Sequence, residues 1–368
     1  MMSAQETVLE IDLAALAHNY RFIRSKLNAD CKMLAVVKAN GYGSDANTIA
    51  LELQELGVDY LAVAYVSEGV FLRDAGVTVP ILVLHPQPIN FELMVSKCLE
   101  PSIYSKRVLE SFAQLAKSNE LVQYPVHLKV NTGLNRLGFS PEDAHKAAAA
   151  INENDALSLR SAFTHLAASE DLAEKDFTLS QLDKFNEILP QIRVNGDSNF
   201  FVHATNTSGV LNYPEAHYDL VRCGIGLYGY GNHPEIDHQL QPVVRLKSVI
   251  SQIHKLKSGE SVGYNRGHVA ANAMTIATIP IGHADGIPRA MGQGVGWVLV
   301  GDQKAPIVGN VCMDMIMVNV THLNCLEGDS VEIYGAAQSA EELANSVGTI
   351  SYELLTAVGD RIKRVVLR

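Results

Sequence analysis

The sequence predicts an α/β fold in which an N-terminal TIM-like (β/α)8 barrel is followed by a mostly-β C-terminal domain. A length of 368 residues with 47% hydrophobic content suits two domains better than one. From about Leu13 to Gly229, short apolar runs alternate with amphipathic stretches. After Tyr230 the segments become short, β-rich and punctuated by glycine and proline. We therefore expect a barrel over residues 1–236 and a β-rich domain over residues 237–368.

We interpret eight apolar runs of the first part as strands and the amphipathic stretches between them as helices. Eight such units in roughly 220 residues favour a closed barrel over an open doubly wound sheet, which usually has fewer strands. An open sheet also tends to begin with a glycine-rich phosphate loop, and none follows the first run here. The predicted strands are Met33–Ala39, Tyr60–Val66, Ile81–Leu84, Pro101–Tyr104, Val126–Val130, Ser161–His165, Phe200–His203 and Leu220–Gly226. Predicted helices include Ala46–Leu56, Arg107–Ser118, Pro141–Asn152 and Leu179–Ile192, whose apolar positions recur at helical spacing.

The second part has few helical patterns. The strand-like run Thr7–Ile11, near the N-terminus, can pair with this part rather than with the barrel, so residues 1–11 are candidates for the β-rich domain. The predicted strands are Val243–Ile250, Met274–Ile279, Trp297–Val300, Ile316–Val320 and Ser330–Tyr334, and the one longer helical pattern is Ala340–Val347.

The composition excludes several classes of function. A formal net charge of −11 argues against sequence-independent binding of nucleic acid, which needs a basic surface. We expect neither a secretory signal within residues 1–10 nor a membrane span, which needs about 18 consecutive apolar residues. The five scattered cysteines fit neither a disulfide framework nor a zinc site. The sequence thus predicts no metal centre and a reducing, cytoplasmic location.

The segment Val36–Gly43 contains the most informative residue. Lys38 ends an apolar, β-branched run just before a tyrosine flanked by glycines. Burial and nearby cations lower a lysine pKa, and the neutral amine is a nucleophile that can form a Schiff base. The glycines allow close approach to a ligand, and Tyr42 offers a hydroxyl donor. The equally weighted alternative is a lysine that reaches solvent at a strand end before an ordinary turn.

Other polar side chains follow the later predicted strands, at the end of a barrel where functional groups gather. Taken singly, a buried histidine is more often a core residue and a hydroxyl run is more often a helix cap, so the convergence carries the argument. The hydroxyl and glycine loops come after the seventh and eighth strands, where barrels often bind phosphate. A phosphate-bearing aldehyde cofactor would use both that region and Lys38. The residues concerned are Lys129, Arg136, His165, His203, Asn206, Thr207, Ser208, Arg222, Gly224, Ile225, Gly226 and Tyr228.

Ordered motifs over essentially the whole chain resemble the alanine racemase family, fold-type III enzymes that depend on pyridoxal 5′-phosphate (PLP). Ala35–Gly43 is similar to the family's PLP-lysine motif, and Thr132–Gly138 to its Thr-Gly-x-x-Arg-Leu-Gly loop. Further matches are Thr164-His165, His203–Thr207, Val221–Ile225, Val262–Tyr264, Pro280–Gly286, Cys312–Asp314 and Thr349–Glu353. The resemblance implies an isomerase that interconverts L- and D-alanine and supplies D-alanine for peptidoglycan of the cell wall.

The resemblance implies a two-base mechanism. Lys38 would hold PLP covalently and act as one base, and Tyr264, from a partner subunit, would be the other on the opposite face. A free tyrosine has a pKa near 10, so a chain from Tyr264 through His165 to Arg222 would assist it. Arg222 would face the pyridine nitrogen. Because arginine is already protonated and shares no proton, the ring would be a weaker electron sink.

Binding roles also follow from the resemblance. Arg136 would contact the PLP phenolic oxygen and the substrate carboxylate, assisted by the Met313 backbone. Lys129 matches a position that is carbamylated in some members, and an ordinary lysine paired with an acid is the alternative. Because Tyr264 and Met313 would come from the other chain, we expect a head-to-tail homodimer. The phosphate would be held by Tyr42, Thr207, Gly224, Ile225 and Tyr352, with Asn206 supporting the loop. His165 would also belong to the cofactor site, and Asp171, His283, Arg289 and Asp314 would lie near the entrance. For Asp171, a solvated acid at a helix start is an equally good account.

Some positions depart from the common family pattern and leave alternatives open. Asn131 stands where Asp is usual, Leu134 replaces Met, Thr207 replaces Ser and His283 replaces Tyr. Leu134 and His283 can alter the pocket, so a preference for serine or a broader range of substrates stays open. A non-catalytic PLP-carrier protein is a further alternative, but it lacks the β-rich domain. A decarboxylase of basic amino acids would have an acidic residue in place of Arg222. The chain could also be part of a longer fusion with a cell-wall ligase.

Overall fold

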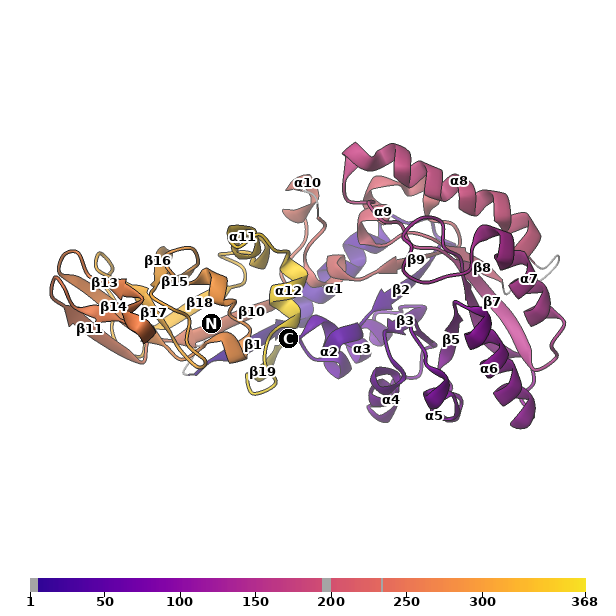
Figure 1. Ribbon diagram of the computed structural model, residues 1–368, viewed down its shortest axis with the longest axis horizontal. Coiled ribbons are helices and arrows are strands. Elements are labelled where there is room, and N and C mark those ends of the chain that lie inside the picture. Colours follow the sequence, from indigo (N-terminus) through magenta and orange to yellow (C-terminus); the bar gives the residue numbers. More distant parts are fainter. Residues whose placement is uncertain (1–5, 194–199, 233) are drawn as a thin grey trace. The chain divides into compact units, whose positions relative to one another are not determined.

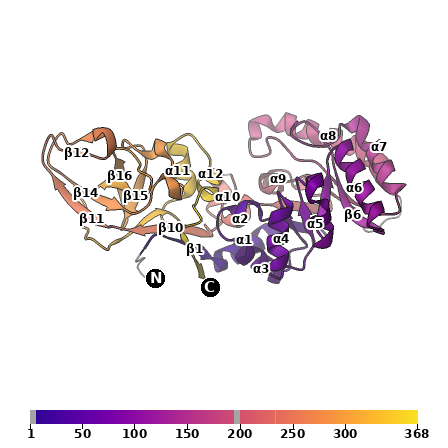
Figure 2. The ribbon, with the colours of Figure 1, turned by 60° about the horizontal axis from the view of Figure 1, so that its bottom comes forward.

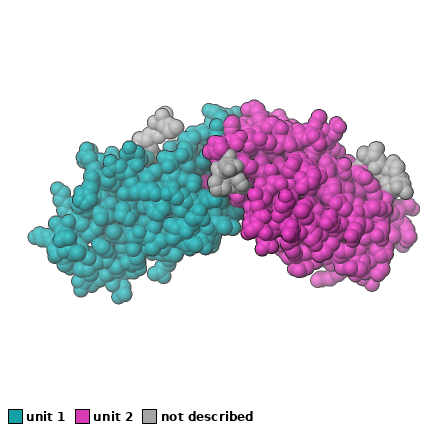
Figure 3. All heavy atoms as spheres, turned by 90° about the horizontal axis from the view of Figure 1, so that it is seen from above, with its two compact units in different colours: residues 1–16, 42–45, 241–368 teal, residues 17–41, 46–240 magenta. Residues whose placement is uncertain are grey.

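The computed structural model describes residues 6–193, 200–232 and 234–368. The chain forms two compact units (Figure 3). The barrel unit comprises residues 17–41 and 46–240, and the β unit comprises residues 1–16, 42–45 and 241–368. The main-chain path therefore leaves the barrel unit for a few residues directly after the segment that carries Lys38.

The described part of the barrel unit contains eight parallel strands in the order β8-β7-β6-β5-β4-β3-β2-β9. The Arg222 N–H donates to the carbonyl of Thr205 at 3.0 Å, which links the last strand to the segment after β8 and brings the sheet close to closure. The strands are β2 Lys32–Val36, β3 Tyr60–Val63, β4 Ile81–Val83, β5 Glu100–Ile103, β6 Tyr124–Lys129, β7 Leu157–Phe163, β8 Phe201–His203 and β9 Leu220–Cys223. The predicted fold class is confirmed for this part of the chain.

Helices lie outside the strands of the barrel unit (Figures 1 and 2). Helix α7 begins where the sequence predicts it, because the Ser140 hydroxyl accepts from the Asp143 N–H and Pro141 is the first helical residue. Helix α6 turns an apolar stripe that includes Val108 and Phe112 toward the core. The helices are α1 Leu13–Arg24, α3 Ala46–Glu55, α4 Val66–Asp74, α5 Phe91–Ser96, α6 Lys106–Ser118, α7 Pro141–Asn152, α8 Lys175–Ile192, α9 Thr207–Asn212 and α10 Pro234–Asp237.

Three predicted strands end three residues earlier than expected, and one of them, predicted as Tyr60–Val66, ends at Val63 before helix α4. The run predicted to continue to Ala39 leaves the sheet at Val36, and the run predicted to reach Gly226 ends at Cys223. In these last two cases the remaining residues turn sharply, into the segment α2 Lys38–Tyr42 and the 3-10 turn Ile225–Tyr228.

The described residues of the β unit form a nine-stranded sheet in the order β11-β14-β17-β16-β15-β18-β10-β1-β19. Strand β1 Val8–Asp12 pairs antiparallel with β10 and parallel with β19, so the N-terminal strand-like run belongs to this sheet. The other strands are β10 Val244–Val249, β11 Gln252–Leu256, β14 Met274–Ile279, β15 Trp297–Val300, β16 Gln303–Val308, β17 Ile316–Asn319, β18 Ser330–Tyr334 and β19 Lys363–Leu367. A small second sheet pairs β12 Ser261–Val262 with β13 His268–Val269, and the helices are α11 Ala340–Ser346 and α12 Ser351–Thr356.

Three strands of the nine-stranded sheet and both strands of the small second sheet were not predicted. Strand β11 lies at the edge of the sheet and buries none of its residues fully, so it lacks the alternation of apolar and polar residues that marks a strand. Strands β16 and β19 also carry charged residues among their apolar ones. Across the described helices, none combines the length and the apolar composition that crossing a bilayer requires.

Candidate active site

Lys38 opens a left-handed turn at the end of the first barrel strand. The φ angles of Ala39, Asn40 and Tyr42 are 53°, 53° and 54°. The Gly41 N–H donates to the carbonyl of Val37 at 3.0 Å and closes the turn. Non-glycine residues at positive φ are disfavoured, and several in succession are found where the surrounding structure enforces them. Lys38 is therefore followed directly by a backbone segment of enforced conformation.

Glu68 stabilises this turn from the neighbouring strand–helix unit. Its carboxylate accepts from the N–H groups of Ala39 at 2.6 Å, Ala64 at 2.7 Å and Tyr65 at 2.9 Å. The Asn40 side chain accepts from the Ala46 N–H at 3.0 Å and fixes the other end of the turn. Glu68 was not predicted as a site residue, although its place in the first turn of α4 is a helix-start signal visible in the sequence.

Within the β unit, the following residues are equally constrained. A Cβ on Gly43 would lie 2.0 Å from the carbonyl oxygen of Leu355, so only glycine fits at this positive φ. The Arg364 guanidinium donates to the carbonyls of Gly43 at 3.0 Å and Ser44 at 3.1 Å. The ring of Tyr42 lies 5.9 Å from that of Tyr352, measured between centroids. Two predicted phosphate-binding residues are thus side by side.

The barrel unit concentrates cations around Lys38. Burial lowers the pKa of Lys38, and Arg136 lowers it further, while Glu68 opposes them. Burial also lowers the pKa of Lys129 to about 8, with Arg136, Arg222 and Lys38 adding to the effect. Every charged group that shifts Lys129 is a cation. Four positive side chains in one region favour an anionic ligand and the neutral form of a lysine amine.

Arg222 is buried, and its position is fixed by hydrogen bonds to neutral acceptors. One terminal nitrogen, Nη2, donates to the carbonyls of Thr164 and Ala204, both at 2.7 Å, and contacts His165 Nδ1 at 3.0 Å. The other, Nη1, contacts His203 Nδ1 at 2.9 Å. Burial, helped by Arg136, lowers the pKa of Arg222 to about 9, so it stays charged near neutrality. The Nε–H and the second Nη1–H have no acceptor among the described residues and can face a ligand.

His165 is held neutral with one defined proton position. Burial, followed by Arg222, lowers its pKa well below the usual range. Because Arg222 has only protons to give, a proton on His165 Nδ1 would oppose the guanidinium, so Nδ1 is unprotonated and shares an Nη2 proton with a carbonyl. The remaining ring proton is then on Nε2, on the side of the ring away from Arg222.

The loop after β9 is tied to the start of α9. The hydroxyl oxygen of Thr207 accepts from the N–H groups of Gly224 and Gly226, both at 3.2 Å, which leaves its own proton to donate. A Cβ on Gly226 would lie 2.5 Å from the Thr207 methyl group. Asn206 caps α9 by accepting from the Gly209 N–H at 2.8 Å. The structure therefore brings together Asn206, Thr207, Gly224 and Ile225, as predicted for a phosphate loop.

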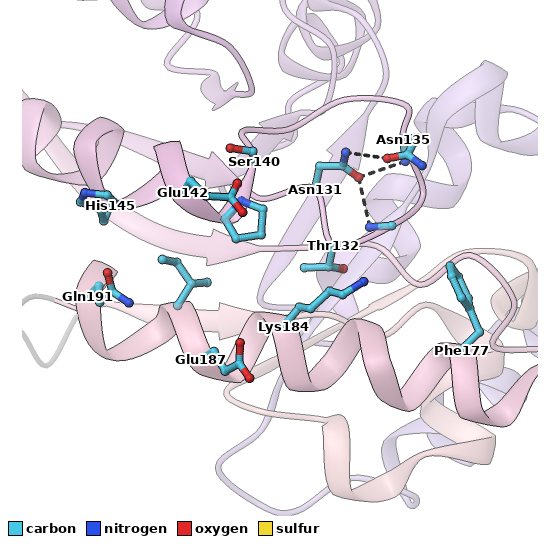
Figure 4. A pocket seen from close by; sticks show the side chains of 13 residues that line it. Asn131, Thr132, Asn135, Ser140, Glu142, His145, Phe177, Lys184, Glu187 and Gln191 are labelled. Carbon is cyan, nitrogen blue, oxygen red and sulfur yellow. Dashed lines mark hydrogen bonds between the residues drawn. The ribbon is translucent and has the colours of Figure 1, made fainter.

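Asn131 organises the loop that carries Arg136 (Figure 4). Its Oδ1 accepts from the N–H groups of Gly133 at 3.2 Å and Asn135 at 2.9 Å, and its Nδ2 donates to the Asn135 side chain at 2.9 Å. An amide at this position can both donate and accept, which an aspartate cannot. The neighbouring cavity of about 840 Å³ is lined by this loop and by residues of α7 and α8. None of the four cations lines it, so we do not assign the chemistry to this cavity.

In the β unit, five predicted site residues line one cavity of about 860 Å³: Tyr264, His283, Arg289, Met313 and Asp314. Tyr264 is 75% exposed and Met313 is 58% exposed. Asp314 is ion-paired with Arg361 at 2.7 Å, and Arg361 also contacts the buried Asp285 at 2.6 Å. Arg361 was not predicted as a site residue, and no sequence motif marks it.

Asp171 has a local structural partner. Its carboxylate accepts from the Ala173 N–H at 2.9 Å and caps the 3-10 turn Leu172–Glu174. This geometry supports the account of Asp171 as a helix-start acid.

Comparisons with known proteins agree with this geometry. The family model described as alanine racemase, N-terminal domain, matches residues 11–232, and that described as alanine racemase, C-terminal domain, matches residues 243–366. This chain belongs to the alanine racemase family. The barrel and the β-rich part thus correspond to the two domains of these enzymes.

Individual alanine racemases match over nearly their full length. One from Desulfovibrio desulfuricans is 36% identical over 361 residues, covering 97% of this chain and 96% of the relative. The structure of alanine racemase from Clostridium difficile 630 has a TM-score of 0.91 at 31% identity, covering 100% of this chain and 97% of the other. That of alanine racemase from Bartonella henselae with covalently bound pyridoxal phosphate has a TM-score of 0.90 at 30% identity, covering 99% and 100%. These similarities confirm the predicted family and favour a racemase over a PLP carrier.

Proposed function

We propose that this chain is a PLP-dependent racemase that interconverts L- and D-alanine, with Lys38 and Tyr264 of the partner subunit as its two bases. The reaction is that of the family to which the chain belongs. The observation that carries the residue assignment is the cationic cluster around Lys38, in which the amine has a lowered pKa and Arg222 a fixed orientation.

The residues present fit PLP. Its phosphate, its phenolic oxygen and the substrate carboxylate are anionic, and the barrel unit supplies Lys38, Lys129, Arg136 and Arg222. A lysine with a lowered pKa suits covalent attachment to an aldehyde. When bound, PLP withdraws electrons from the α-carbon of the amino acid and acidifies its proton.

Each binding residue has a proposed role. The free N–H groups of Arg222 would face the pyridine nitrogen, and Arg136 would contact the phenolic oxygen and the substrate carboxylate, with the Met313 backbone of the partner assisting. Because Arg222 is buried and already protonated, it shares no proton with that nitrogen. A ring nitrogen that receives no proton from Arg222 would withdraw less charge from the substrate, which would favour rapid return of the proton over side reactions. The phosphate would be held by Tyr42, Thr207, Gly224, Ile225 and Tyr352, with Asn206 supporting the loop.

Lys38 and Tyr264 of the partner subunit would move protons on opposite faces of the substrate. The neutral His165 keeps its proton on Nε2, so it can donate to the Tyr264 oxygen and stabilise the phenolate. Arg222 fixes that tautomer from the other side. The chain Tyr264–His165–Arg222 therefore supplies a base near neutrality without adding a carboxylate.

A head-to-tail homodimer completes this proposal. Tyr264, Met313 and Met315 are exposed around one cavity of the β unit, and a second copy would cover them. We infer residues 1–236 as the PLP-binding domain and residues 237–368 as the domain that serves the partner, with residues 1–11 in its sheet. His283, Arg289 and Asp314 would line the entrance, with Asp171 near it. The product would supply D-alanine for peptidoglycan in the cytoplasm.

A racemisation assay tests the proposal directly. The PLP-loaded protein is incubated with L-alanine, L-serine and L-lysine, and the D-enantiomers are measured by chiral chromatography. We expect turnover of alanine well above that of the others. Turnover of none of them with PLP bound would contradict the proposal and support a carrier protein, and faster turnover of serine would change the assigned substrate.

A separate measurement concerns Lys129. Mass spectrometry under native conditions with added bicarbonate reports whether Lys129 is carbamylated.

A further inference from the structure

A chain of buried polar side chains leads away from Arg222 through the barrel. His203 Nε2 lies 3.0 Å from the Ser161 hydroxyl, which lies 2.7 Å from His127 Nδ1. His127 Nε2 lies 2.7 Å from a Glu100 carboxylate oxygen. His127, Ser161 and His203 are fully buried, at 0% exposure. The Tyr264–His165–Arg222 chain does not use any of them.

These residues line the interior of the barrel. They are on consecutive strands, from Glu100 on β5 to Arg222 on β9. The ring of Tyr60, on β3, packs edge-on against His127 of β6 at 6.0 Å between centroids, although β4 and β5 separate those strands. Such a contact is possible only across the barrel interior. Glu100 begins its strand and Arg222 lies near the end of its own, so the chain runs from the N-terminal toward the C-terminal end of the barrel.

The donors and acceptors of this chain follow one order. Arg222 can only donate, so His203 Nδ1 accepts and the His203 proton is on Nε2. That proton goes to the Ser161 oxygen, which leaves the Ser161 hydroxyl proton for His127 Nδ1. His127 then keeps its proton on Nε2, facing the carboxylate of Glu100. In this order every proton of the chain has an acceptor.

We propose that Glu100, His127, Ser161 and His203 are positioning residues for the racemase, forming a relay of fixed proton order that holds the His203 lone pair toward Arg222. The kinetic effect of this inference rests on the proposed function, whereas the proton order of the relay does not. The His203 ring is also fixed by stacking on Phe163, with centroids 4.7 Å apart and 14° between the planes. Without Ser161, His203 could move its proton to Nδ1, where it would oppose an Arg222 N–H and turn the guanidinium away from the pyridine nitrogen.

The barrel contains a matched pair of serines for the test. Ser161 and Ser102 are both fully buried on barrel strands, and each is aligned with His127 on the strand between them. The Ser102 hydroxyl has no hydrogen-bond partner among the described residues, whereas Ser161 has two. Ser161→Ala therefore breaks the relay, and Ser102→Ala removes the same atom without breaking it.

The decisive readout is the histidine tautomer, measured by nitrogen-15 NMR on cofactor-free protein and assigned with His127→Gln and His203→Gln. In the unsubstituted protein we expect Nε2 protonated and Nδ1 unprotonated in both rings. In Ser161→Ala we expect His203 to lose this single tautomer, and in Ser102→Ala to keep it. A doubly protonated ring, or a proton on His203 Nδ1, in the unsubstituted protein would overturn the relay even if Ser161→Ala fails to fold.

Kinetics of the PLP-loaded protein provide the second readout. Ser161→Ala should lower kcat about tenfold, the factor expected for one buried hydrogen bond, with KM within about twofold. Ser102→Ala should change neither by more than about twofold. Equal kcat values for the two variants would overturn the positioning role. If the unsubstituted protein racemises nothing, the proposed function fails, and the tautomers alone decide the relay.

Discussion

At the scale of single residues, the hydrogen bonds of Arg222 decide which ring nitrogen carries the proton in each neighbouring histidine. Arg222 donates to two carbonyls and faces two histidine nitrogens, so it sets the tautomer of both rings. His165 is thereby prepared to donate toward Tyr264 of the partner subunit, and His203 to donate toward Ser161. One buried arginine thus sets the proton positions of both His165 and His203.

Replacing Tyr264 tests the division of labour between the two bases. In Tyr264→Phe, the α-proton of one alanine enantiomer should exchange with deuterated water about 100-fold more slowly, because its general base is lost. The other enantiomer should still exchange through Lys38. Proton NMR of each enantiomer in deuterated buffer gives both rates, and the absorbance of bound PLP shows that the site is intact. Full racemisation by this variant would reject the role of Tyr264.

Lys129 predicts a pH dependence of stability. Its pKa is lowered by burial from 10.5 to about 8 in the folded protein, so between these values the unfolded chain binds a proton that the folded chain has released. Stability should therefore rise with pH through that window, and the destabilisation should be complete below it. Urea unfolding of the cofactor-free protein on both sides of pH 8 should show the rise, and Lys129→Met should reduce it. An equal rise in both proteins would contradict the assignment.

At the scale of elements, the left-handed turn after β2 is the feature that positions Lys38. The residues of this turn belong to a motif that was identified from the sequence, but the left-handed conformation of the turn was not predicted. A run of Val, Lys, Ala and Asn carries no local signal for positive φ, and only the glycines suggested a turn. Glu68 holds the turn, and Arg364 holds the residues Gly43 and Ser44 that follow it, and sequence periodicity reveals neither contact.

Two glycines test how tightly this turn is enclosed. Gly43 and Gly57 both have positive φ, at 80° and 87°, but a Cβ on Gly57 would meet nothing within 4 Å. Gly57→Ala should cost about 1–2 kcal/mol for its backbone alone. Gly43→Ala should cost about 1–3 kcal/mol more, because its Cβ would overlap the Leu355 carbonyl. Unfolding in urea measures both free energies, and equal losses would contradict the close packing.

The sequence predicted the strands better than the segments between them. The limits of Met274–Ile279, Trp297–Val300 and Ser330–Tyr334 agree with the structure, because each is a short run rich in apolar or β-branched residues with glycine, proline, asparagine or aspartate close to either end. Within the site, Lys38, Arg222 and His165 were identified by their motifs. Glu100 and His127 were not, because their link to Arg222 arises only when five neighbouring strands align.

At the scale of the whole molecule, the chain divides its proposed catalyst between two units. The barrel unit contains Lys38, His165 and Arg222, and the β unit contains Tyr264 and Met313. The exposure of Tyr264 and Met313 is what a surface that completes another copy's site requires. The central claim is therefore that one active site needs two chains.

A subunit-mixing experiment tests that claim most directly. Lys38→Ala and Tyr264→Phe are each purified as inactive protein, then mixed, dissociated and reassociated with PLP. A heterodimer would contain one doubly altered site and one site with both Lys38 and the partner's Tyr264 intact. Random pairing makes half the dimers heterodimers, so we expect about one quarter of the unsubstituted racemase activity to return. No return of activity, with heterodimers confirmed by mass spectrometry, would contradict a site shared between subunits.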